Sequence, residues 1–86
     1  MSQQPSQHTI QAPFPGVFYR RPAPDQAPFV EPGQRVEADT VIGLIEVMKQ
    51  FCELKAEAAG TIVSIEVEDE AVVEAGQPLA ILETAP

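Results

Sequence analysis

The chain is short and acidic. Its 86 residues include 13 Asp and Glu against 5 Lys and Arg, which gives a formal net charge of -8. A chain of this length buries one modest core and leaves little room for an enclosed active site, so an autonomous enzyme is not expected. Negative charge disfavours binding to a phosphate backbone, and charges or prolines interrupt each hydrophobic run before it could span a bilayer. We therefore expect neither nucleic acid nor a membrane as a partner.

Residues 1–8 are expected to form a disordered tail before the folded domain. They include Gln and Ser, and they lack both the basic start and the apolar stretch of a signal peptide. His8 lies in this segment without a Cys, Asp or Glu at ligand spacing, so the sequence predicts no metal site there. We assign His8 no role.

From residue 9 to residue 84 the sequence predicts an all-β domain. Helical periodicity is not sustained, whereas short β-branched runs recur between Gly, Pro and acidic residues. Eight such runs are found, at residues 9–12, 17–19, near 36, 41–47, 51–57, 61–67, near 72 and 79–83. Eight short strands suit a small sandwich or a flattened β-barrel.

The chain also matches itself at two offsets. At an offset of 44, residues 10–19 match residues 54–63 in their Ala, Gly and apolar positions. At an offset of 37, residues 36–46 match residues 73–83, including a shared Val-Glu-Ala and a final Glu. The two offsets differ by seven residues, so the first half carries an insertion between Tyr19 and Val36 that the second half lacks.

This insertion falls in residues 20–33, which contain four of the nine prolines. Proline removes a ladder hydrogen bond, so this segment cannot be a central strand. Its composition alone is typical of a stiff surface loop.

The chain must reverse between the runs at 41–47 and 51–57, and the reversal falls at Met48-Lys49. Two-residue hairpin turns need positive φ angles, which Gly, Asn or Asp usually supply. Two larger residues at such a turn cost about 1 kcal/mol or more in backbone strain, which suggests that their side chains are needed. A free lysine amine is mostly protonated at neutral pH, so an external enzyme must acylate it. A solubilising turn residue remains the alternative for Lys49 from pattern alone.

Cys52 follows in the returning run and is the single cysteine. It cannot form an internal disulfide, which favours a reducing compartment, with the cytoplasm as the default. We expect it to be a packed small side chain and not a reactive thiol.

The segment Glu46-Val47-Met48-Lys49-Gln50, placed between Ala12-Pro13-Phe14-Pro15-Gly16 and Ala56-Glu57-Ala58-Ala59-Gly60, resembles the biotinyl domain. That family carries Glu-Ala-Met-Lys-Met at its hairpin tip. The resemblance covers about residues 9–84. It implies a flattened β-barrel of two four-stranded antiparallel sheets with quasi-twofold symmetry, which the two offsets would produce.

Residues 19–30 are similar to the thumb of bacterial acetyl-CoA carboxylase carriers, a loop that many biotinyl and lipoyl domains lack. We call residues 20–33 the thumb. In those carriers the thumb projects beside the biotinyl lysine and contacts the cofactor. The resemblance therefore implies biotin contacts for Pro22, Ala23, Pro24 and Asp25.

The resemblance also implies a non-catalytic carrier function. A biotin protein ligase would join biotin to the Lys49 amine, with Glu46, Val47, Met48 and Gln50 as its recognition segment. Lys55 matches no attachment position. A biotin carboxylase would then carboxylate the cofactor, and a carboxyltransferase would pass the carboxyl group to an acyl-CoA, for acetyl-CoA carboxylase in fatty acid synthesis.

Three residues depart from the family pattern: Val47 replaces Ala, Gln50 replaces Met, and Glu70 stands where the repeat has Gly33. The first two flank the acceptor and bear on ligase recognition. At the third, Asp69 is the neighbour that best tolerates left-handed geometry. The surrounding acidic cluster is expected to be a solvated loop.

Three alternatives stay open. The first is a carrier of another biotin-dependent acyl-CoA carboxylase, since the sequence does not name the acyl-CoA; the thumb is the feature that favours acetyl-CoA carboxylase. A lipoyl carrier shares the barrel and the apical lysine, but its usual residue before the lysine is Asp or Glu, where this chain has Met48. An unmodified interaction module is favoured only by Val47 and Gln50.

Overall fold

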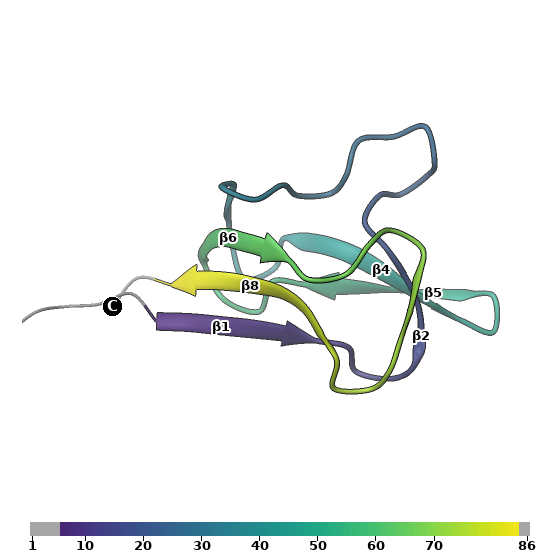
Figure 1. Cartoon of the computed structure of the whole chain (residues 1–86). Helices are drawn as coiled ribbons and strands as arrows, with labels where there is room; N and C mark the ends of the chain where they lie inside the picture. Colours follow the sequence, from purple (N-terminus) through teal and green to yellow (C-terminus); the bar gives the residue numbers. More distant parts are fainter. Residues whose placement is uncertain (1–5, 85–86) are drawn as a thin grey trace, which may run out of the picture.

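The computed structural model describes residues 6–84, and every regular element in this range is a β-strand (Figure 1). The strands are β1 (Ser6–Gln11), β2 (Gly16–Tyr19), β3 (Arg35–Val36), β4 (Val41–Val47), β5 (Gln50–Lys55), β6 (Gly60–Ile65), β7 (Ala71–Val73) and β8 (Pro78–Thr84). They form two four-stranded sheets with the orders β1-β8-β6-β3 and β5-β4-β2-β7, and all neighbours are antiparallel. The predicted all-β fold with two four-stranded sheets is confirmed.

The two sheets are related by the internal repeat. Advancing β1 and β2 by one repeat gives β5 and β6, and advancing β3 and β4 gives β7 and β8, which converts the strand order of one sheet into that of the other. Positions matched by the two offsets are buried in both halves: Ile10 with Leu54, Phe18 with Ile62, Val36 with Val73, and Ile45 with Leu82. The duplicated pattern therefore specifies one shared core between two equivalent sheets.

Phe18 is the largest fully buried side chain and lies near the centre of this core. Its ring packs against the backbone of Gly43, where an added Cβ would lie 2.6 Å from the ring. Gly16 brings β2 equally close to β4, since a Cβ there would lie 2.6 Å from the Glu46 carbonyl oxygen. These two glycines let β2 and β4 approach closely, and β4 carries the candidate lysine at its end.

The start of the domain differs from the expectation. β1 begins at Ser6, which pairs with Thr84 of β8, so residues 6–8 belong to a strand and not to a tail. His8 Nε2 lies 2.9 Å from Glu57 Oε1, a contact that its assignment to a solvated tail had excluded. The expectation failed because backbone pairing to a neighbouring strand does not require apolar side chains on an exposed face. The rest of the predicted tail, residues 1–5, lies outside the described residues.

The hairpin β4-β5 extends beyond the barrel at one end, opposite the start of β1 and the end of β8 (Figure 1). The thumb is the blue loop above the barrel between β2 and β3, and it contains no strand. Val30, near its end, is only 1% exposed and is part of the core. The burial of Val30 therefore anchors the C-terminal side of the thumb.

Residues 6–84 include no helix with the length and apolarity that a bilayer span requires.

Candidate functional site

The hairpin turn has the geometry that its two-residue length requires. Met48 has φ 50° and Lys49 has φ 67°, and the flanking residues Val47 and Gln50 pair across the hairpin. Positive φ at both central residues defines a type I′ turn, which matches the twist of the two strands. Neither residue is a glycine, so the predicted strained turn is confirmed.

Both turn side chains are presented to solvent. Met48 is 91% exposed, and Lys49 is also exposed and forms no ion pair with any described residue. Lys55, in contrast, lies within β5 opposite Val41, at the far end of that strand from the turn. Of the two lysines, only Lys49 stands at an apex that a second protein can approach from several directions.

Glu46 connects the hairpin to the next strand of its sheet. The Tyr19 hydroxyl donates a hydrogen bond of 2.8 Å to Glu46 Oε1, and this joins β2 to β4 below the turn. The Tyr19 ring in turn lies against Phe51 of β5, with ring centroids 5.8 Å apart and a tilt of 53°. This bracing makes the hairpin a rigid base for Lys49. It also gives Glu46 a partner within its own chain, which the sequence did not indicate.

The hydrogen bond to Glu46 raises the pKa of Tyr19, with smaller contributions from partial burial and from nearby negative charge. We expect Glu46→Gln to lower the pKa of Tyr19 towards that of a free phenol. The chain has one Tyr and no Trp, so the absorbance of the phenolate during an alkaline titration reports this residue alone.

The same shift has a consequence for stability. Because the pKa of Tyr19 is higher in the folded chain than in the unfolded one, the stabilisation is complete below the ordinary phenol pKa and is lost as the pH rises through the raised value. Wild type should therefore lose stability more steeply than Glu46→Gln above about pH 10. If the free energy of unfolding of the two proteins falls equally with rising pH, the hydrogen bond from Tyr19 to Glu46 does not persist in solution.

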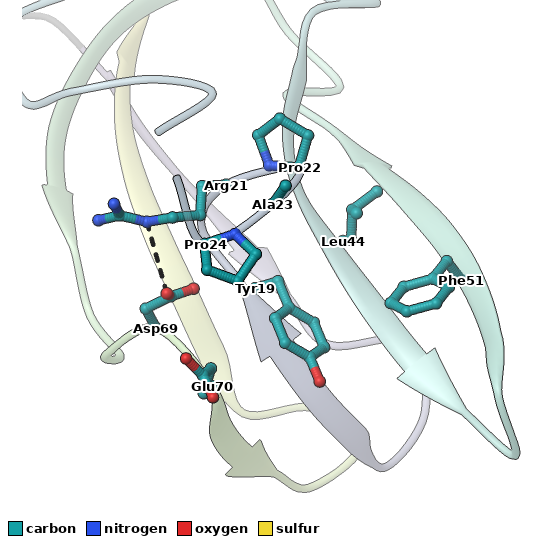
Figure 2. Close-up of a pocket in the computed structure, with 9 residues that line it drawn as sticks. All are labelled: Tyr19, Arg21, Pro22, Ala23, Pro24, Leu44, Phe51, Asp69 and Glu70. Atoms are coloured by element: carbon teal, nitrogen blue, oxygen red, sulfur yellow. Dashed lines mark ion pairs between the residues drawn. The ribbon is translucent and has the colours of Figure 1, made fainter. Parts of the chain in front are cut away.

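A pocket of about 320 Å³ lies between the thumb and the hairpin sheet (Figure 2). Its thumb wall consists of Arg21, Pro22, Ala23 and Pro24. Its opposite wall and floor come from the sheet and from the loop between β6 and β7: Tyr19, Leu44, Phe51, Asp69 and Glu70. The structure thus brings three of the four predicted thumb contacts together on one apolar wall.

Asp25 and Lys49 do not line this pocket. Asp25 is exposed beyond the wall formed by Pro22 and Pro24, and Lys49 lies at the end of the hairpin. A cofactor on Lys49 would need the length of its own arm to reach the thumb. The predicted contacts with Pro22, Ala23, Pro24 and Asp25 stay predictions.

The other face of the hairpin carries a shallow apolar groove lined by Phe14, Val47, Met48, Gln50 and Cys52. Three of the four residues expected to contact a ligase therefore share one surface, while Glu46 faces Tyr19. Cys52 is exposed, so the expectation of a packed thiol was wrong. The reason is that β5 is the edge strand of its sheet: Ile45, which pairs with Cys52, is buried in the core, whereas of the β5 residues only Leu54 is buried.

Asp69 is the site residue that sequence reasoning missed. It was expected to be a solvated acid that relieves the missing glycine, but the positive φ of 68° falls on Glu70 itself. Asp69 instead accepts a hydrogen bond of 2.7 Å from the Arg20 amide, and its Oδ2 lies 3.5 Å from Arg21 Nε. The replacement of the repeat's glycine, Gly33, by Glu70 marked this loop as unusual in the sequence. It did not indicate that Asp69 contacts the thumb. No group of three or more metal-binding side chains occurs among the described residues.

Comparison with known proteins identifies the family. The Biotin_lipoyl family model, described as "Biotin-requiring enzyme", matches residues 8–82. The chain belongs to this family. Biotin is accordingly the cofactor with which its members are associated.

The chain is also similar to several biotin carboxyl carrier proteins. It is 36% identical over 78 residues to the biotin carboxyl carrier protein of acetyl-CoA carboxylase from Haemophilus influenzae, covering 91% of this chain and 50% of that protein. It is 42% identical over 72 residues to the protein of the same name from Pseudomonas aeruginosa, covering 84% and 46%. The chain thus spans half or less of the length of these relatives.

Among solved structures, the chain is similar to part of the urea carboxylase of Kluyveromyces lactis, with a TM-score of 0.73 and 25% sequence identity. The superposition covers 90% of this chain and 6% of the urea carboxylase. The same barrel is therefore found as a small part of a much larger carboxylase.

Proposed function

We propose that this chain is the biotin carboxyl carrier of an acetyl-CoA carboxylase and that Lys49 bears the biotin. The observation that carries the proposal is the solvent-exposed lysine in a strained type I′ turn at the end of a braced hairpin. The relatives from H. influenzae and P. aeruginosa, both named as carriers of acetyl-CoA carboxylase, support the choice of enzyme.

The residues present fit a covalently held biotin. The Lys49 amine has no internal ion pair among residues 6–84 that would compete with acylation, and its hairpin is held by the Tyr19 to Glu46 bond. When bound, biotin supplies the ring nitrogen that carries a carboxyl group. The chain itself supplies position. Its rigid hairpin raises the effective concentration of the tethered group at the two partner sites.

The individual residues then have distinct roles. Val47, Met48 and Gln50 offer an apolar, exposed surface beside the acceptor to a biotin protein ligase. Pro22, Ala23 and Pro24 form an apolar wall on one side of the pocket for the cofactor, and the exposed Asp25 follows them in the thumb as a fourth contact. Glu46 completes the segment offered to the ligase and also holds the hairpin, since its carboxylate accepts the Tyr19 hydrogen bond.

The partners are a biotin protein ligase, a biotin carboxylase and a carboxyltransferase. We place the carrier in the cytoplasm, because the exposed, unpaired thiol of Cys52 suits a reducing compartment. Acylation of Lys49 removes one positive charge, so the working carrier is more acidic than its formal charge of -8 indicates.

The test is the intact mass of the chain after coexpression with a biotin protein ligase. We expect a gain of one biotinyl group. A gain of one lipoyl group would instead identify a lipoyl carrier, and an unchanged mass would favour an unmodified interaction module. Acceptance of acetyl-CoA over longer acyl-CoA substrates by the reconstituted carboxylase separates the acetyl-CoA carrier from carriers of related enzymes.

A further inference from the structure

Residues 20–28, the projecting part of the thumb, are tied to the rest of the chain by one acidic side chain. Asp69 lies on the loop between β6 and β7, 49 positions after Arg20 in the sequence. Its Oδ1 accepts the Arg20 backbone N–H at 2.7 Å, and its Oδ2 lies 3.5 Å from Arg21 Nε. Among the described residues, no other side chain outside the thumb forms a hydrogen bond or ion pair with residues 20–28.

Arg21 links Asp69 to the projecting part of the thumb. Its Nη1 donates to the Gln26 carbonyl at 3.3 Å, while the Gln26 amide donates to the Ala23 carbonyl at 3.0 Å. At the base, the Phe29 amide donates to the Arg20 carbonyl at 2.8 Å and closes the loop. The orientation of the turn at residues 22–26 therefore depends on Arg21, and Arg21 is held by Asp69.

The surroundings shield this pair from water more than an ordinary surface ion pair. The Asp69 side chain is 25% exposed and that of Arg21 is 33% exposed, so water screens their attraction only partly. Arg21 Nε is shielded from water and has no hydrogen-bond partner within residues 6–84, which leaves the Asp69 carboxylate as the group that compensates its charge. A hydrogen bond from an amide to a carboxylate is also among the stronger kinds.

The same contact forms one side of the pocket. Figure 2 shows the Arg21 side chain directed to Asp69, with Pro22, Ala23 and Pro24 following it above Tyr19 and facing the strand that carries Phe51. If Arg21 were released, the proline wall would lose its link to the barrel on this side. Val30 would still anchor the other end of the thumb.

We propose that Asp69 is a positioning residue that holds the thumb over the hairpin and so sets the pocket beside the carrier lysine. Its role in the reaction rests on the proposed carrier function, whereas its hold on the thumb does not. Asp69 also lines the pocket, and its carboxylate is engaged by Arg20 and Arg21 of the thumb and forms no hydrogen bond or ion pair with Lys49.

The first experiment uses the unmodified chain and nitrogen-15 relaxation and hydrogen exchange. In Asp69→Ala the Arg20 amide should exchange at least about tenfold faster, since a charge-assisted hydrogen bond is lost. Order parameters of residues 21–28 should fall while those of β4 and β5 stay at wild-type values. Asp69→Asn keeps an acceptor for Arg20 but loses the charge opposite Arg21, so it should protect Arg20 and still loosen the residues after it.

Glu68→Gln is the matched control, because it removes one negative charge from the same loop, and the Glu68 carboxylate forms no hydrogen bond or ion pair with any described residue of the thumb. It should match wild type. Should Asp69→Ala unfold, the isosteric Asp69→Asn decides the question alone. Unchanged thumb order in the folded Asp69 variants, or equal loosening in Glu68→Gln, overturns the proposal.

The second experiment measures carboxyl transfer per loaded carrier with biotin carboxylase and carboxyltransferase. Ligase loading of Lys49 should be the same in all variants, while the transfer rate of Asp69→Ala should fall towards that of a chain lacking residues 22–28. A loosened thumb with an unchanged transfer rate would overturn the positioning role. If wild type itself takes no biotin, the proposed function fails, and the relaxation data still decide whether Asp69 holds the thumb.

Discussion

Lys49→Arg is expected to abolish biotin loading while leaving the barrel folded. Arginine keeps the positive charge and a long side chain at the same turn position, but its guanidinium is not deprotonated in proteins and cannot act as the acylated nucleophile. The turn strain is unchanged because both residues have the same backbone requirement at φ 67°. The measurement is intact mass after incubation with ligase, ATP and biotin, together with the unfolding midpoint.

Lys55→Arg is the control for this experiment. It makes the same chemical change on β5, six positions along the chain, where the lysine is a strand residue opposite Val41. It should load as wild type does, because the hairpin turn is intact. If Lys49→Arg still takes up biotin, or if Lys55→Arg does not, the proposal that Lys49 is the attachment site is wrong.

The second large effect is expected for Phe18→Ala, which should destabilise the fold by about 3 to 5 kcal/mol. Phe18 is fully buried between the two sheets, and its ring packs on Gly43, so the cavity left by truncation cannot easily collapse. Small domains are typically stable by only about 5 to 15 kcal/mol, so a substantial unfolded population is expected. Urea unfolding followed by the fluorescence of Tyr19 measures the change, since Tyr19 is the only tyrosine.

Phe51→Ala tests whether burial is the cause. It deletes the same atoms from a ring that is 58% exposed on the projecting hairpin. We expect a loss of about 1 kcal/mol, mainly from the contact with Tyr19. A loss as large as that of Phe18→Ala would mean that the hairpin, and not the shared core, holds the barrel together.

The contacts that brace the hairpin connect the fold to the proposed function. Lys49 forms no ion pair with any residue from 6 to 84, and its turn lies at the projecting end of the hairpin (Figure 1). A carrier does not catalyse the reaction itself, so it needs a lysine that extends from the domain in a defined direction. The barrel supplies the direction through β4, which is paired on both sides by β5 and β2.

Much of this structure follows from local patterns that the sequence carries by itself. The eight strands follow from alternating and β-branched runs, and the pairing of the two sheets follows from the repeat offsets, since Phe18 and Ile62 occupy equivalent core positions. The turn at Met48-Lys49 was predictable because a two-residue connection leaves the backbone few conformations. The resemblance to the biotinyl domain rested on these same residues.

Other features were decided only by the tertiary structure. Residues 6–8 are polar, and they become a strand because β8 offers backbone partners to them. Cys52 is exposed because β5 lies at the edge of its sheet, a place that depends on how all eight strands pair. The bond between Tyr19 and Glu46 and the contact of Asp69 with the thumb join residues 27 and 49 positions apart. Side-chain pattern specifies local backbone geometry and which face is apolar, but contacts between loops depend on where distant strands bring them. The short, acidic sequence with two lysines therefore led to the proposal that Lys49 is the anchor, whereas the contact of Asp69 with the thumb was seen only in the folded chain.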